Sequence, residues 1–408
     1  MDQQMTWQEA QSRLLAWAQA PRADAVRLRH ALYSYTEQPL PAETPYPPFH
    51  VALNKGFAIN HDYASKRLAQ TAGAVRMRIM GRVPVGKARR GAPIVDRAFR
   101  ASIGDFLPEW LDTIIDESAQ PRVEGSEGLV FESVPEKYTD VMPAGSIIPR
   151  QEAIIGAPRR LGYPELTILA VQGNEEVHAF IKPITGLLII GTPLHPWDAD
   201  RTSRERMPDI LTPLFQYILA RWQFPFVSLG AHEEEWRDRI TAASEQVDVL
   251  LLSGLIGSEE WSELSSFLES QLTVRIRGLK HPLGGQFLAG EGHGRWLFFL
   301  PYQPVFAMAL YALLLHPFLF RLSGDPEGQL PYREGRLLEG AVIEVADDDI
   351  WVGEEKLTRD FAKPPELRLL KQISRATMAT LARGNCLAIP RSISANPQPG
   401  DMVTVLRY

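Results

Sequence analysis

The sequence predicts a multidomain α/β protein, with a central three-layer α/β/α domain whose sheet is mostly parallel. Three segments carry this prediction, because each is a β-rich, almost uncharged run that ends in a corner of small residues or prolines and is followed by helical spacing. Short apolar runs of this kind are typical of strands that are buried on both faces of a parallel sheet. The three segments are residues 186–194, 247–257 and 296–304.

The corners after these strands predict the position of a binding site. In a parallel sheet, ligands bind at the carboxyl ends of the strands. We therefore expect the three corners to lie side by side around one crevice. They are Gly191-Thr192-Pro193, Ser253-Gly254-Leu255 and the segment from Pro301 to Pro304.

The N-terminal region is predicted to be mainly helical. In residues 5–19, apolar side chains such as Ala10 and Leu14 recur at spacings of three and four, and Thr6 is placed to cap the helix. A second short helix is predicted for residues 24–33. Farther along we expect a helix at 151–161, strands at 167–171 and 177–180, and helices of the central domain at 208–222 and 233–246.

A small β-rich domain is predicted as an insertion into the N-terminal region. Residues 75–82 alternate between apolar and charged side chains, and glycines punctuate the stretch that follows. The tail shows a similar pattern, with strands expected at 341–345, 350–352, 386–389 and 402–406. The predicted domains are residues 1–45 with 135–178 (helical and linker), 46–134 (inserted β), 179–325 (central α/β) and 326–408 (C-terminal β).

Composition excludes several classes of protein. The chain has 408 residues, 45% of them hydrophobic and 23% charged, which indicates a soluble globular protein of several domains. Its formal net charge of −6 gives no general attraction to nucleic acid or to anionic membranes. Its one cysteine, Cys386, excludes an internal disulfide framework and a cysteine-rich metal site. The first residues lack the features of a signal peptide, so we expect a cytoplasmic location.

One uncharged stretch, residues 296–320, is long enough to resemble a membrane span. Pro301 and Pro304 cannot lie inside a continuous helix without breaking its hydrogen bonds. His316-Pro317 should end the helix that starts near Pro304. We therefore predict a buried strand followed by a core helix, and no membrane span.

Generic catalytic motifs are absent from the sequence. It has no phosphate loop, dinucleotide fingerprint, zinc-protease motif or nucleophile elbow. His293 lies in a predicted hairpin turn, which favours a turn residue over a metal ligand, and Cys386 lies in an apolar strand, which favours a core position. Glu259 and Glu260 begin a predicted helix, where acidic side chains interact favourably with the helix dipole.

Several segments match one family pattern in order along nearly the whole chain. Pro47-Pro-Phe-His-Val-Ala-Leu-Asn-Lys-Gly-Phe-Ala58 is similar to Pro-Pro-Phe-Asp-Asn-Ser-Ala-Met-Asp-Gly-Tyr-Ala, and Asp112-Thr-Ile-Ile115 to Asp-Ala-Val-Val. Ser253-Gly-Leu-Ile-Gly-Ser-Glu-Glu260 is similar to Ser-Gly-Gly-Val-Ser-Val-Gly-Asp. Lys280-His-Pro-Leu-Gly284 is similar to Lys-Pro-Gly-Lys-Pro, and Leu300-Pro-Tyr-Gln-Pro-Val-Phe-Ala307 is similar to Leu-Pro-Gly-Asn-Pro-Val-Ser-Ala. In order and spacing these segments resemble the molybdopterin molybdenumtransferases, called MoeA in bacteria and the E domain of gephyrin in animals.

The resemblance implies a fold, an activity and a set of ligands. The fold would be the four-domain arrangement above, assembled as an elongated homodimer. In the family, adenylylated molybdopterin and molybdate meet at the α/β crevice, and Mg²⁺ assists cleavage of the adenylate as molybdenum enters the dithiolene. The resemblance implies catalytic roles for Asp112, Glu260 and Lys280. It implies ligand-binding roles for Lys55, Gly191, Thr192, Ser253, Gly254, Pro301 and Pro304.

The sequence departs from the family pattern at several of these positions. Lys55 stands where the family has an aspartate, and Pro193 where it has a glutamate. Two unit charges about 4 Å apart interact by about 4 kcal/mol at an effective dielectric near 20, so an ammonium in place of a carboxylate opposes a bound Mg²⁺. The sequence therefore argues against a Mg²⁺ site of the family's kind, and it leaves the metal ligands unknown.

Two functions stay open at this point. The chain either binds molybdopterin or its adenylate and inserts or handles molybdenum with weakened or altered catalysis, or it is a non-catalytic dimeric scaffold for protein interactions. Cofactor-pathway proteins are candidate partners. Leu255, Tyr302 and Phe306 are larger than the family's residues and favour the scaffold by filling the crevice. An open cleft with basic residues would favour the first function, and a plugged cleft the second.

Overall fold

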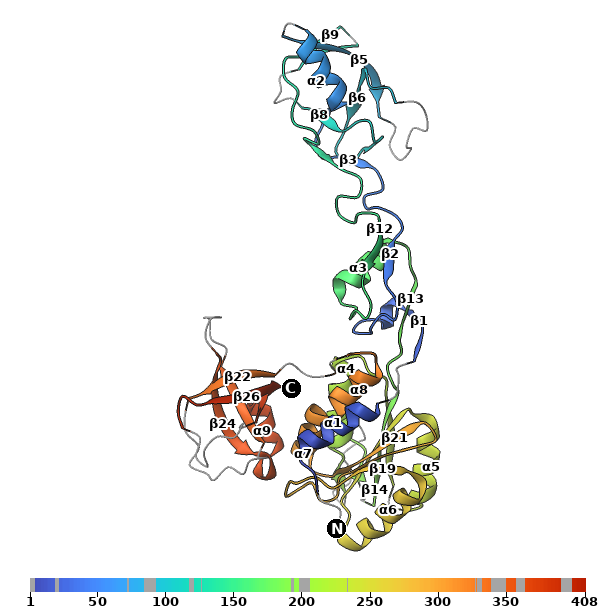
Figure 1. Ribbon diagram of the computed structural model, residues 1–408, viewed down its shortest axis with the longest axis vertical. Helices are drawn as coiled ribbons and strands as arrows, with labels where there is room; N and C mark the ends of the chain where they lie inside the picture. The colour runs from blue at the N-terminus through green and yellow to red at the C-terminus, as the bar shows by residue number, and fades with distance from the viewer. Residues whose placement is uncertain are drawn as a thin grey trace. The chain divides into compact units, whose positions relative to one another are not determined.

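The computed structural model of the protein is drawn in Figure 1. It describes residues 4–18, 22–71, 73–83, 93–116, 121–125, 127–191, 194–197, 206–232, 234–326, 328, 332–338, 350–356, 364–389 and 398–408. Contacts divide the chain into two compact units. The first unit comprises Met1–Glu37, Pro158–Leu161 and His178–Tyr408, and the second comprises Gln38–Ala157 and Gly162–Val177. The boundaries of the four predicted domains remain a prediction, because this division into two units does not test them.

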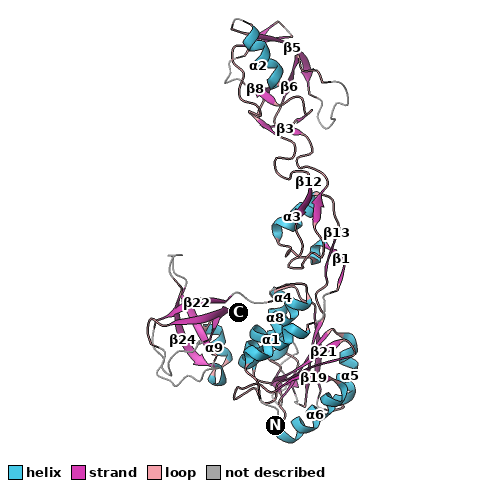
Figure 2. Cartoon of the chain, in the orientation of Figure 1, coloured by secondary structure: helices cyan, strands magenta, loops and turns pink. Residues whose placement is uncertain are grey.

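A six-stranded mixed sheet forms the centre of the first unit (Figure 2). Two neighbouring inner strands, β14 and β18, are buried along their whole length, because they carry mostly aliphatic side chains. Strands β17, β14, β18 and β21 are parallel to one another. Strand β20 is antiparallel to β21, and β19 is antiparallel to β20. The order across the sheet is β17 (Phe226–His232), β14 (Thr185–Ile190), β18 (Val249–Gly254), β21 (Arg295–Pro301), β20 (Leu288–Gly292) and β19 (Thr273–Arg277).

Helices cover both faces of this sheet, as the predicted three-layer arrangement requires (Figure 1). Side chains alternate along each strand, so that Leu187 and Leu251 belong to one core cluster while Leu188 and Leu252 belong to the other. The first cluster packs against α1 (Trp7–Trp17), α4 (Leu211–Arg221), α7 (Pro304–Leu310) and α8 (His316–Leu322), and the second against α5 (Trp236–Gln246) and α6 (Ser258–Gln271).

The predicted end of the core helix at His316-Pro317 is wrong. A π-helical turn, Tyr311–Leu315, joins α7 to α8, and the backbone N–H of His316 donates to the carbonyl of Tyr311. The wider turn changes the hydrogen-bond register just before Pro317, whose ring nitrogen cannot donate. The chain therefore stays helical from Pro304 to Leu322.

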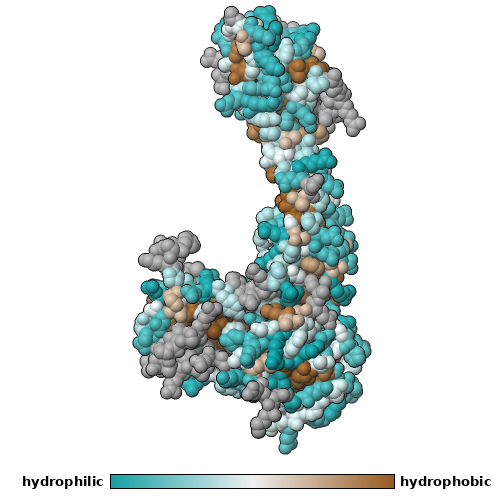
Figure 3. Space-filling view, viewed as in Figure 1, coloured by the Kyte–Doolittle hydropathy of each residue, from teal (hydrophilic) through white to brown (hydrophobic). Residues whose placement is uncertain are grey.

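Among the described residues, the run Pro304–Leu322 is long and apolar enough to cross a membrane. However, 89% of the most apolar 18-residue stretch of this run is buried inside the protein. The face of the molecule drawn in Figure 3 carries mostly polar side chains with scattered apolar ones. The burial of the run is that of a core helix.

The N-terminal elements of the first unit only partly match the prediction. Helix α1 is confirmed, and Thr6 and Glu9 form its capping box. The helix predicted at 24–33 is wrong. Ala23–Arg27 is instead strand β1, followed by one 3₁₀ turn, because it pairs with β13 (Glu176–Phe180) far along the chain.

The second unit is β-rich, with two helices. The helix predicted at 151–161 is wrong, because Gln151–Ile155 forms strand β12 against β2. The strand predicted at 167–171 is also wrong, since these residues lie in α3 (Tyr163–Val171), whose start is fixed by Glu165 accepting from the Gly162 N–H. The remaining elements are β2 (Leu40–Ala42), β3 (His50–Ala52), β4 (Gly56–Ile59), α2 (His61–Gln70), β5 (Val75–Arg82), β6 (Arg97–Ala101), β7 (Phe106–Leu107), β8 (Thr113–Ile115), β9 (Arg122–Glu124), β10 (Gly128–Phe131) and β11 (Val141–Met142).

A closed β-barrel forms the C-terminal part of the first unit. Cys386 is fully buried in it, as predicted for a core residue. The predicted strand at 341–345 lies outside the described residues. The barrel contains β22 (Tyr332–Leu337), β23 (Trp351–Lys356), β24 (Glu366–Gln372), β25 (Cys386–Ile389) and β26 (Met402–Arg407), with helix α9 (Met378–Arg383) between β24 and β25.

Candidate functional site

The carboxyl ends of three parallel strands lie side by side in the first unit. Ile189 of β14 is paired with Ser253 of β18, and Ser253 with Leu300 of β21. One step farther along, Gly254 is paired with Pro301. The predicted convergence of the three corners is therefore what the sheet shows, and it defines the candidate site.

Two glycines let the backbone pass closely at this edge of the sheet. A Cβ built on Gly254 would clash with the carbonyl oxygen of Ile190 on the neighbouring strand. Gly191 has a φ of +67°, a left-handed conformation that favours glycine, and its N–H donates to the carbonyl of His232. Thr192, the next predicted ligand-binding residue, lies outside the described residues.

Ser253 is a part of the sheet itself. Its side chain is completely buried, and its hydroxyl donates to the carbonyl of Leu300 at 2.8 Å. This hydrogen bond joins β18 to β21 at the point where both strands end. In this arrangement the hydroxyl is used within the protein, and Gly254 is itself buried against the carbonyl of Ile190, so both residues hold the strand ends together.

The corner after β21 starts a helix. Pro304 is the first residue of α7, where the absent N–H of proline costs nothing, and the side chain of Gln303 accepts from the N–H of Phe306. Tyr302 is partly buried, and its hydroxyl accepts from the N–H of Ile210 at 3.4 Å. Burial raises the pKa of Tyr302 above its ordinary value, so the phenol is neutral at pH 7.

Lys280 follows the edge strand β19 on an exposed turn, and its backbone N–H donates to the carbonyl of Met5. The adjacent His281 stacks on Phe306, with ring centroids 4.7 Å apart and ring planes at 12°. Phe306 is only 2% exposed, and the cavity left between these rings, Trp7 and Leu313 is about 10 Å³. Phe306 therefore fills space on this side of the sheet, as its size predicted.

Leu255 does not fill the crevice, because it is 49% exposed. Glu260 is also exposed and lies in the first turn of α6. Its carboxylate folds back over the start of that helix, since a Cβ on Gly257 would lie 2.6 Å from Oε2 of Glu260. The carboxylate therefore interacts with the positive end of the helix dipole.

Asp209 is a residue near this edge that the sequence reasoning missed. It is 8% exposed, and its Oδ1 accepts from the N–H groups of Leu211 and Thr212 at 2.9 and 3.2 Å. It thereby caps α4 beside Tyr302, whose pKa it helps to raise after the larger effect of burial. An aspartate two residues before a helical run was the available signal.

Asp112 and Lys55 belong to the second unit. Asp112 is buried, accepts from the N–H of His61 at 2.8 Å and pairs with Lys137 at 3.3 Å. It therefore holds the first residue of α2, which is a structural task. Lys55 is exposed at the turn before β4, and its N–H donates to the side chain of Asn54.

Comparison with known proteins was made for the whole chain. The profile of the MoeA N-terminal region (domain I and II) matches residues 5–173. A molybdopterin molybdenumtransferase from Haemophilus influenzae is 21% identical over 335 residues, which cover 80% of this chain and 80% of that protein. Two crystal structures of molybdopterin biosynthesis MoeA proteins from Pyrococcus horikoshii share the fold, with TM-scores of 0.79 and 0.72, 20% and 16% identity, and coverage of 99% and 100% of both chains.

Residues 5–173 match the MoeA N-terminal region, and together with the relative and the shared fold this match supports membership of the chain in the MoeA family. Its fold is MoeA-like, with mixed sheets and helices in several domains. The family resemblance seen in the sequence motifs is thus confirmed, whereas the roles assigned to individual residues remain predictions.

Metal ligands were tested against the described side chains of this MoeA-family chain. Among them, no three His, Cys, Asp or Glu side chains gather where they could hold a metal ion. Glu260 is turned to its own helix and Asp209 caps α4. Because these carboxylates do not converge, the described part of the chain offers no set of ligands that fits Mg²⁺, and no reaction step is assigned to Mg²⁺.

Proposed function

We propose that the chain acts in molybdenum cofactor biosynthesis and binds molybdopterin or its adenylate at the carboxyl ends of β14, β18 and β21. The proposal rests mainly on the register of three strands. Ile189, Ser253 and Leu300 lie side by side, so the carboxyl ends of β14, β18 and β21 form one edge of the sheet. The family match and the name of the Haemophilus influenzae relative, a molybdopterin molybdenumtransferase, support the ligand class.

The chemistry of this edge suits a ligand that carries phosphate. Gly191 presents exposed backbone without a side chain at the end of β14. Lys280 supplies an exposed ammonium, which attracts a phosphate or molybdate oxygen. The stacked pair of His281 and Phe306 narrows one side, so we expect the ligand to lie over the strand ends rather than between these rings and Trp7.

Molybdenum insertion is part of the proposal. In this reaction water cleaves the phosphoanhydride of adenylylated molybdopterin, which gives molybdopterin and AMP. The two dithiolene sulfurs bind molybdenum, and their protons leave with one molybdate oxygen as water. We propose that the ammonium of Lys280 stabilises the negative charge that develops on the phosphate of the leaving AMP. We also propose that the protein acts in the cytoplasm as a homodimer.

AMP release is the direct test. The purified full chain is incubated with adenylylated molybdopterin and molybdate, with and without Mg²⁺, and AMP is measured by chromatography. AMP release above the protein-free rate is expected. Binding without AMP release would limit the protein to carrying the ligand, and absence of both binding and release would refute the proposal in favour of a scaffold. Light scattering of the same preparation tests the dimer.

A further inference from the structure

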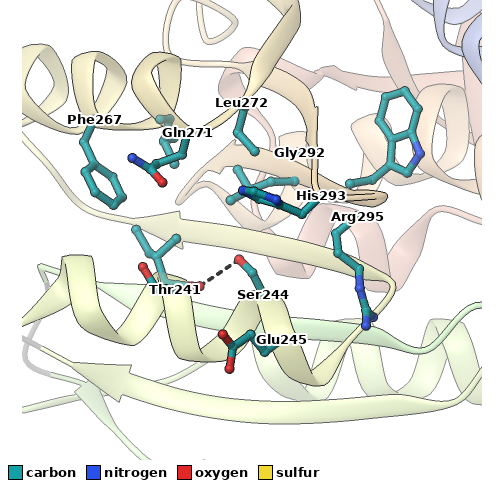
Figure 4. A pocket seen from close by; sticks show the side chains of 13 residues that line it. Thr241, Ser244, Glu245, Phe267, Gln271, Leu272, Gly292, His293 and Arg295 are labelled. Carbon is teal, nitrogen blue, oxygen red and sulfur yellow. Dashed lines mark hydrogen bonds between the residues drawn. The ribbon is translucent and has the colours of Figure 1, made fainter.

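A second cavity lies in the first unit at the opposite end of the sheet from the proposed site. It has a volume of about 550 Å³, within the range of small-molecule sites. It opens between the last turns of α5 and α6 and is closed at one side by the β20–β21 hairpin (Figure 4).

The floor of the cavity is apolar. Ile240 of α5, Leu268 of α6 and Leu297 of β21 are all at most 3% exposed and belong to the core cluster on this face of the sheet. Phe267 and Leu272 form the wall on the α6 side, and Figure 4 shows Phe267 directed into the space between the helices. An apolar body, aromatic or aliphatic, would be removed from water in this position.

The hairpin is built to reach this cavity. Gly292 lies against the end of α6, since a Cβ there would be 2.7 Å from the carbonyl oxygen of Gln271. The turn residues His293 and Gly294 both have positive φ, at 52° and 72°, as a tight two-residue hairpin turn requires. In Figure 4 the imidazole of His293 lies between Leu272 and Ser244, at the rim of the cavity.

The charge around the rim favours a positively charged ligand. Helices α5 and α6 both end here, and neither has a basic residue in its last turn, so the negative ends of their dipoles are not offset from within the helices. Glu245 adds a carboxylate at the rim, and it pairs with no basic side chain in the described part of the chain.

Arg295 is the one guanidinium that lines the cavity among the described residues, and it is already engaged. Its Nη1 donates to the carbonyl of Val247 at 2.6 Å and lies 3.3 Å from Asp248. Figure 4 shows its side chain running away from Gln271 and Phe267. Val247 is the C-cap of α5, so this guanidinium offsets the negative end of that helix, and Asp248 balances the charge of Arg295. Glu245 and the carboxyl end of α6 therefore set the sign of the potential.

We propose that this cavity binds a small organic cation, with an apolar body against Leu268 and Leu297 and an ammonium group near Glu245 and the carboxyl end of α6. Apolar area provides affinity and the rim provides selection by charge. The proposed function does not use this site, so the two can be tested separately.

Three probes of matched size test the proposal on the full chain: 2-phenylethylammonium, neutral 2-phenylethanol and 3-phenylpropionate. Binding is measured by calorimetry and by the NMR shifts of the histidine side chains. We expect the ammonium probe to bind about tenfold more tightly than the carboxylate, because the carboxyl end of α6 and the Glu245 carboxylate favour it. The signal of His293 should move more than those of the other histidines.

Two variants and a control identify the site. Ser244→Phe should fill the cavity and abolish binding, and Glu245→Gln should reduce the preference for the ammonium probe at least threefold. Glu259→Gln removes the same charge from the opposite end of α6 and should leave binding unchanged. Equal or tighter binding of the carboxylate, no binding of any probe at millimolar concentration, or His293 signals that do not respond would overturn the proposal. The histidine shifts decide the matter even if Ser244→Phe does not fold.

Discussion

The backbone of Gly254 lies against the carbonyl oxygen of Ile190, with no room between them for a side chain. This contact joins the ends of β18 and β14, next to the pairing of Gly254 with Pro301. The edge of the sheet at the proposed site is therefore held together by backbone as well as by the buried hydroxyl of Ser253.

Gly254→Ala should destabilise the first unit by about 1–3 kcal/mol, since the added methyl group forces the two strand ends apart. Denaturant unfolding followed by tryptophan fluorescence measures this loss. Gly257→Ala is the matched control, because the methyl group there meets only the flexible carboxylate of Glu260. We expect the control to lose less than about 1 kcal/mol. Equal losses would mean that the close approach at Gly254 does not limit stability.

His316 should make the protein sensitive to acid. The residue is 2% exposed, and its burial is the main reason that the pKa of the imidazole falls from 6.5 to about 3. Below pH 6.5 the unfolded chain takes up a proton that the folded chain does not, so stability falls as the pH is lowered towards 3. Between pH 7 and pH 5 this group should lower the free energy of unfolding by about 2 kcal/mol.

The measurement compares wild type with His316→Leu at both pH values. The variant should lose about 2 kcal/mol less than wild type over this range. Tyr311 lies 3.1 Å from Nδ1 of His316, so Tyr311→Phe removes the hydrogen bond and keeps the titrating group. That control should retain the wild-type dependence on pH. A dependence that persists in His316→Leu would assign it to other groups.

Asp112→Ala should loosen the start of α2 in the second unit. The buried carboxylate accepts from the His61 N–H and pairs with Lys137, and its loss should cost about 1–3 kcal/mol. Hydrogen exchange of the α2 amides measures the effect. Asp62→Ala removes the exposed partner of the same lysine and should cost at most about 1 kcal/mol. Asp112→Asn that keeps α2 protected but stops AMP release would instead support the catalytic role implied by the family.

Lys280→Ala should weaken binding of adenylylated molybdopterin about tenfold, because an exposed ammonium that meets a phosphate contributes a charge-assisted hydrogen bond. Calorimetry at two salt concentrations measures the affinity, and the difference from wild type should shrink at high salt. Lys66→Ala, an exposed lysine of α2, serves as the control and should not change affinity. An unchanged affinity in Lys280→Ala would remove this residue from the site.

Much of the first unit follows from local pattern. The runs at 186–190 and 249–252 contain almost only aliphatic side chains, so they had to be strands buried on both faces, and the alternation of Leu187 and Leu188 between two cores follows. The helix errors lie where local pattern competes with a distant partner. Ala23–Arg27 and Gln151–Ile155 could form helices by composition, but each is a strand because another strand pairs with it.

The sequence by itself determined that three apolar strands end in adjacent corners, because uncharged β-rich runs are stable only inside a sheet and parallel strands end on one edge. Only the tertiary structure decided what the corner residues do. Ser253 bonds to Leu300, 47 residues away, and Phe306 stacks on His281. The direction of a side chain depends on which neighbours the fold brings to it, and a linear pattern does not contain that information.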